Sequence, residues 1–165
     1  ARDLLIASVL CPDPVIYIDD RWLYDNEEEI SLTPEIDINK FQPKIIKSGN
    51  DLTIVSSSFS TQLALDSAKD LSTFGIDSEI IDVRVLNPLK VDLLIESVNK
   101  TKRLIVLDGG WKNSGFAAEI ISSVTESIEI NVLKSKPLRV TLPDSPAPTS
   151  RKLESIYYPS TSFIV

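Results

Sequence analysis

Apolar and polar positions along the chain alternate in a way that predicts strands and helices in turn. Short apolar runs typical of buried strands occur at residues 44–47, 52–56, 79–83, 104–107 and 138–142. Apolar residues recur at helical spacing within 60–74, 91–98 and 117–124. Strands that alternate with helices predict right-handed crossovers and a parallel sheet covered on both faces. We therefore expect an α/β fold, a three-layer αβα sandwich of about five strands.

Three turn signals refine this expectation. Ser48-Gly49-Asn50 separates the first two predicted strands without a helix, which predicts one antiparallel edge strand in a mainly parallel, mixed sheet. Gly75 follows the first predicted helix and is expected to form its C-terminal cap. Asp108-Gly109-Gly110 is expected to form a turn after the fourth strand.

The first 42 residues lack the regular alternation of predicted strands and helices that the rest of the chain shows. An apolar helix is predicted over 4–10, a turn at Pro12 and Pro14, and a short strand over 15–18. One helix and one strand cannot bury both of their apolar faces, so we interpret residues 1–24 as the tail of another domain. Residues 25–42 are acidic and lack a period, which predicts a linker before one domain over 43–165.

Composition narrows the class of protein. The 165 residues include 17 basic and 24 acidic side chains, and the net charge of −7 argues against a nucleic-acid or anionic-membrane partner. No apolar run approaches the roughly 18 residues that span a bilayer, and no signal-peptide pattern opens the chain, so we expect a cytoplasmic protein. Cys11 is the only cysteine, which excludes an internal disulfide and a thiolate metal cage.

The chain contains no histidine. A Ser-His-Asp relay, a Cys-His pair, a histidine general base and a histidine-ligated zinc are therefore excluded. We expect no catalytic residue in these 165 residues.

Open parallel sheets bind ligands beyond the carboxyl ends of their strands, and two segments of this chain are candidate sites there. The Ser56-Ser57-Ser58 run suits either an anion or, as we favour, capping of the next helix by Ser58 or Ser60. The loop 108–115 resembles a phosphate loop, but its Lys precedes the last Gly; we favour a packing loop that presents Trp111 to a neighbouring surface.

Three charged residues lie near the predicted ends of strands. Asp82 and Arg84 end the third strand, and we favour a structural ion pair between them over a site that orients a substrate acid. Asp144 lies on a proline-stiffened loop, where it suits docking of a basic partner or simply keeps the loop soluble.

A series of segments follows in a characteristic order and spacing: 52–55, 75–76, 81–88, 103–108, 115–120, 146–148 and 153–154. With these segments, residues 49–165 resemble the C-terminal domain of transketolase-like, thiamine-diphosphate-dependent enzymes. Within that group, the chain is most similar to the β subunit of 2-oxo acid dehydrogenases of the pyruvate and branched-chain type. Residues 4–24 resemble the tail of the preceding pyrimidine-binding domain.

This resemblance implies that the catalytic and cofactor-binding residues of the full enzyme lie outside this chain. The family's cofactor-activating glutamate and catalytic histidine lie upstream of the matching segment, and its magnesium-diphosphate motif lies in a partner subunit or domain. Thiamine diphosphate and magnesium are therefore expected in the full enzyme but not on this chain alone, which should be inert by itself and contribute to assembly. The expected partners are an α-type subunit, a second β-type subunit and the acyltransferase core of a dehydrogenase complex.

The resemblance also implies two sites. Family members bind potassium at the helix-to-strand turn that corresponds here to Ser8, Val9, Cys11 and Asp13. Asp144 matches the aspartate that contacts the acyltransferase's subunit-binding domain.

Two other functions stay open. The chain would suit the C-terminal section of a transketolase or deoxyxylulose-phosphate synthase. From another class, it would suit a free-standing flavodoxin-like module that binds phosphate or protein through loop 109–115.

Overall fold

A five-stranded sheet forms the centre of the molecule. The computed structural model describes all residues from Ala1 to Val165. The strands run in the order β1-β3-β2-β4-β5; β2, β3, β4 and β5 are parallel, and β1 pairs with β3 antiparallel. The expected mixed sheet with one antiparallel edge strand is therefore confirmed. The strands are β1 (Lys44–Lys47), β2 (Leu52–Ser56), β3 (Ser78–Asp82), β4 (Leu104–Trp111) and β5 (Leu138–Leu142).

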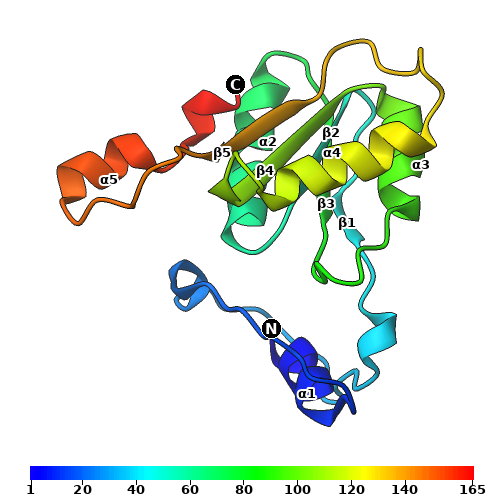
Figure 1. Cartoon of the computed structure of the whole chain (residues 1–165), viewed down its shortest axis with the longest axis vertical. Helices are drawn as coiled ribbons and strands as arrows, with labels where there is room; N and C mark the ends of the chain where they lie inside the picture. The colour runs from blue at the N-terminus through cyan, green and yellow to red at the C-terminus, as the bar shows by residue number, and fades with distance from the viewer.

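Helices cover both faces of this sheet, as a three-layer sandwich requires (Figure 1). On one face lies α2 (Phe59–Thr73), against which the short 3-10 helix η3 (Thr161–Phe163) packs near the C-terminus. On the other face lie α3 (Asp92–Thr101) and α4 (Phe116–Ser127).

Alternation along the central strands divides the core in two. Successive side chains of a strand point to opposite faces, so Ile54 and Ile80 pack with α2, whereas Val55 and Ile81 pack with α3 and α4. All four side chains are fully buried. Because both faces are covered, all five residues of β2 are buried, the polar Thr53 and Ser56 included.

Glycine shapes the ends of two elements. Gly75 adopts a φ of +74° directly after α2, and backbone bonds from Gly75 to Ser72 and from Ile76 to Leu71 close a Schellman motif, which confirms the predicted cap. Gly49 precedes β2, and a Cβ there would lie 2.3 Å from the carbonyl carbon of Ser78. Only glycine therefore fits where these two segments touch.

A buried polar network joins the amino ends of β2 and β3 to α3. The side chain of Glu79 is 1% exposed, and its carboxylate accepts hydrogen bonds from Ser97 and Lys100, both at 2.5 Å. Thr53 extends the network through hydroxyl contacts of 2.7 Å with Ser97 and 2.6 Å with Thr101. These contacts give hydrogen-bond partners to the buried side chains of Thr53, Glu79, Ser97 and Thr101 in an otherwise apolar core.

The first 42 residues lie beside the sheet domain and are mostly irregular (Figure 1). They contain α1 (Arg2–Leu10) and the 3-10 helices η1 (Arg21–Leu23) and η2 (Ile38–Lys40). The strand predicted over 15–18 is wrong: Ile16 and Ile18 are 89% and 77% exposed, because no strand of this chain lies beside them to pair with.

Near the C-terminus, α5 (Arg151–Tyr157) projects from the sheet domain and was not predicted (Figure 1). None of the helices has the length and apolar character required to cross a bilayer.

Candidate functional site

A crevice opens at the carboxyl edge of the sheet, between β2 and β4. The chain leaves β2 toward β3 on one side, and β4 lies on the other side, so the order of strands reverses at this point. Such switch points are where open α/β sheets bind ligands. A cavity of about 470 Å³ lies here, bounded by the loop after β2, by residues 107–109 of β4, by residues 18–22 and by Tyr158.

Aromatic side chains from distant parts of the sequence form one wall of this cavity. The ring of Trp22 lies edge-on to Phe59 with centroids 4.8 Å apart, and its centroid is 5.1 Å from that of Tyr158. Asp20 accepts the backbone N–H of Trp22 at 3.1 Å and so starts the short helix η1 that holds the indole. This cluster joins the N-terminal segment to the sheet domain, and the sequence analysis did not find it.

The serine loop after β2 does not cap α2 with its side chains. Ser58 occupies the N-cap position with a φ of 53°, but its hydroxyl makes no capping hydrogen bond. Backbone bonds from Ser60 to Ser57 and from Thr61 to Ser58 begin the helix instead. The predicted side-chain cap is therefore wrong, and the hydroxyls of this loop line the cavity.

Asp108 joins the glycine-rich end of β4 to the start of α4. Its Oδ1 accepts the N–H of Gly110 and its Oδ2 accepts the N–H of Ala117 at the start of α4, both at 2.8 Å. The ladder with β5 resumes at Trp111 after an irregularity, so the turn predicted at 108–110 is wrong and β4 runs through it.

The same carboxylate removes the loop's capacity to hold phosphate. The N–H group at the start of α4 is already bonded to Asp108, whose negative charge would repel an anion. The sequence analysis placed Asp108 in a turn and missed its bond to the start of α4; the available signal was an Asp before a Gly-Gly pair and shortly before a helix.

Asp82 and Arg84 do not form the predicted ion pair. The strand ends at Asp82, and Arg84 adopts a φ of 66°, which turns the backbone away from the extended form that the prediction required. No ion pair within 4.0 Å joins them; the Arg84 guanidinium lies over the Phe41 ring, 5.0 Å from its centroid. Burial raises the pKa of Asp82, although the charge of Arg84 and a hydrogen bond from Thr61 act in the opposite direction.

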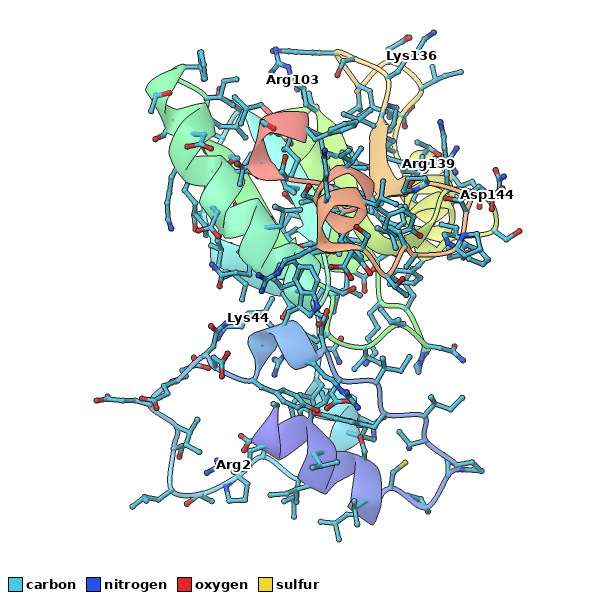
Figure 2. The ribbon with its side chains drawn as sticks, turned by 90° about the vertical axis from the view of Figure 1, so that its left-hand side faces the viewer. Arg2, Lys44, Arg103, Lys136, Arg139 and Asp144 are labelled. Carbon is cyan, nitrogen blue, oxygen red and sulfur yellow. The ribbon has the colours of Figure 1, made fainter.

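Trp111 and Asp144 lie at the same edge of the sheet. Trp111 pairs with Leu142, and Asn113 donates a 2.7 Å hydrogen bond to Asp144. Arg139 donates to the carbonyl of Lys112 at 3.0 Å, and Figure 2 shows Arg139 and Asp144 on the same side of the sheet domain. The Trp111 side chain is half exposed. Both residues are thus accessible, and their binding of a partner stays a prediction.

The four residues of the predicted potassium site surround the end of α1. The helix ends at Leu10, so the last-turn carbonyls of Ser8 and Val9 have no helical partners, and Cys11 and Asp13 follow in the turn. The Ser8 hydroxyl donates to the carbonyl of Leu4 at 2.7 Å. Carbonyl oxygens of this kind suit a hard cation, and the potassium site stays a prediction.

The residues of this chain do not fit magnesium-bound thiamine diphosphate. No group of three or more His, Cys, Asp or Glu side chains is placed to hold a metal ion. No Lys or Arg lines the cavity to pair with a diphosphate.

Comparison with known proteins identifies close relatives. The transketolase C-terminal domain family matches residues 42–164. Over its whole length, the chain is 38% identical in sequence to the β subunit of the pyruvate dehydrogenase E1 component of Ascaris suum, and the match covers 46% of that subunit. Over 99% of its length, it is also 34% identical in sequence to the β subunit of an acetoin:2,6-dichlorophenolindophenol oxidoreductase of Cupriavidus necator, and the match covers 48% of that subunit. The chain thus spans about half the length of these relatives.

Among solved structures, the fold is similar to a split-gene transketolase described as an inactive β4 tetramer. The TM-score is 0.65 at 24% identity, over 79% of this chain and 42% of that one. This similarity agrees with the sheet order and the covering helices described above. On the family match over most of its length, the chain belongs to the transketolase C-terminal domain family.

Proposed function

We propose that this chain is the C-terminal part of the β-type subunit of a thiamine-diphosphate-dependent 2-oxo acid dehydrogenase, of the pyruvate class. The observation that carries the proposal is similarity over the entire chain to pyruvate dehydrogenase β subunits, at 31–38% identity. The whole enzyme would use thiamine diphosphate and magnesium, and this part would contribute surfaces for assembly, without catalytic residues of its own.

The exposed apolar side chains of the first 42 residues support a role within a larger assembly. Leu32 is 98% exposed, Ile16 is 89% exposed, and Val9 on α1 is 75% exposed. Exposed apolar surface of this extent marks sites that contact another protein or another part of the same one. We propose that it contacts the rest of a longer β-type subunit and an α-type subunit, with a second β-type subunit as a further partner.

The edge that carries Trp111 and Asp144 is the proposed docking point for the acyltransferase core. Both residues are accessible, and the bond from Asn113 holds the Asp144 carboxylate in place. A carboxylate held on a stiff loop favours a basic partner, because less side-chain freedom is lost on binding.

The potassium site at Ser8, Val9, Cys11 and Asp13 belongs to the same proposal. The cytoplasmic location stays a prediction, since a relative is named as mitochondrial.

Reconstitution tests this function. The chain is combined with the N-terminal half of a β-type subunit and with an α-type subunit, and decarboxylation of pyruvate and branched-chain 2-oxo acids is measured with and without thiamine diphosphate. We expect cofactor-dependent turnover that requires this chain. Transfer of a ketose-phosphate unit in its place would support the transketolase alternative, and the absence of both activities would contradict the proposal.

A further inference from the structure

We propose that the cavity between β2 and β4 is a binding site for a small, flat molecule that carries a positive charge or several hydrogen-bond donors. The proposal goes beyond the assembly role above and concerns only residues of this chain. The cavity volume of about 470 Å³ lies within the range of small-molecule sites in proteins.

The walls of the cavity favour a flat ligand. Trp22, Phe59 and Tyr158 line it together, with ring centroids about 5 Å apart in two of the pairs. Leu63 and Val140 add apolar surface beneath them. Aromatic faces and edges of this kind bind planar groups by stacking and edge contacts.

Polar groups without partners face the same space. Ser57, Ser58 and Ser60 line the cavity, and none of their hydroxyls forms a hydrogen bond within the chain. Ser58 also holds a positive φ that a non-glycine residue rarely adopts. Three free hydroxyls offer a ligand both donors and acceptors.

The charges around the cavity decide between a cation and an anion. Asp20 and Asp108 line it, whereas no Lys or Arg does. One oxygen of Asp20 accepts the Trp22 N–H, and its other oxygen has no partner in the chain. A cation near the carboxylates and aromatic faces is attracted, and an anion is repelled, in spite of the helix N-terminus and the serines.

The test uses two probes that share a phenol ring but differ in charge: tyramine, which is cationic, and 4-hydroxyphenylacetate, which is anionic. Binding to the full chain is measured by isothermal titration calorimetry. The chain has two tryptophans, so in a Trp111→Phe background the tryptophan fluorescence reports on Trp22 alone. We expect tyramine to bind at least tenfold more tightly than 4-hydroxyphenylacetate and to change the Trp22 fluorescence.

Two variants locate the site. Gly109→Leu fills the cavity without backbone strain, because a Cβ there meets only the Ser60 hydroxyl at 3.9 Å; it should weaken tyramine binding at least tenfold. Asp20→Asn keeps an oxygen for the Trp22 N–H but removes the charge, and should weaken only tyramine. Asn99→Leu, on the exposed side of α3, is the matched control and should change neither affinity.

The results divide cleanly. Selective tyramine binding that Gly109→Leu abolishes supports the site. Equal affinity for both probes, binding that survives Gly109→Leu, or no binding of tyramine up to its solubility limit would each overturn it. None of these outcomes depends on whether the reconstituted enzyme is active, so failure of this proposal is distinguishable from failure of the proposed function.

Discussion

Removing the positive partner of the buried Glu79 carboxylate is the sharpest test of how the sheet and α3 are held together. Lys100→Met keeps most of the aliphatic stem but leaves Glu79, which is 1% exposed, with only Ser97 and a long contact to the Gly49 N–H. Loss of one member of a buried pair costs roughly 3–5 kcal/mol. The Lys100 side chain is 43% exposed, which discounts the expected loss to about 2 kcal/mol.

The pH dependence gives this prediction a second readout. Burial raises the pKa of Glu79, but the hydrogen bonds from Lys100 and Ser97 outweigh burial, so the folded-state pKa is lowered. The unaltered chain therefore gains stability from this group above the unfolded-state pKa and loses it as pH falls through the folded-state value. In Lys100→Met burial dominates and the pKa of Glu79 rises, so the deficit of the variant should shrink as pH falls.

The assay is urea unfolding followed by circular dichroism at several pH values between neutral and acidic. Lys69→Met is the matched control, because its ion pair with Asp66 lies on the surface of α2 with side chains 74% and 43% exposed. That control should lose less than about 0.5 kcal/mol. A Lys100→Met loss as small as the control, or one that does not change with pH, would refute the description of Glu79 as a buried, paired carboxylate.

Three further predictions use the same unfolding assay. Gly49→Ala should lose roughly 2–3 kcal/mol, because its Cβ would overlap the backbone of Ser78; a neutral effect would mean that these segments move apart freely. Asp108→Ala should lose about 1–2 kcal/mol, since the N–H of Ala117 loses its cap, and an unchanged midpoint would contradict the capping role. Burial raises the pKa of Asp82, so the ionised carboxylate destabilises the folded chain at neutral pH, and this loss of stability is recovered as the pH falls through the raised pKa. Asp82→Asn should therefore stabilise the chain at neutral pH only. A gain in stability that persists in acid would contradict this reasoning.

Local patterns were sufficient to predict the five strands and the three helices that cover the sheet, α2, α3 and α4, but not α5 or η3. Runs such as 52–56 and the helical spacing before Gly75 report burial directly, because each face of a strand or helix that is apolar must be covered. The same reasoning failed at 15–18, where an apolar extended run has no neighbouring strand. Pairing depends on what lies beside a segment, and its own residues do not contain that information.

The cavity could not be predicted from local sequence patterns either, because residues far apart in the sequence form it. Its aromatic wall brings together Trp22, Phe59 and Tyr158, which are far apart in the sequence and meet only after the chain has folded. Asp108 was read as part of a turn because its hydrogen bond to Ala117 spans nine positions. By contrast, loop 108–115 and the serine run were recognised as candidates, since the carboxyl ends of parallel strands could be located from the sequence.

The burial of Ile164 has a consequence for synthesis of the protein. This residue packs into the core beneath α2 together with Leu52 and Ile54, and is only 7% exposed. During translation, the first strands leave the ribosome long before residue 164 does, so that core stays incomplete until residue 164 has emerged. Truncation or cleavage before Ile164 would leave apolar surface open to aggregation.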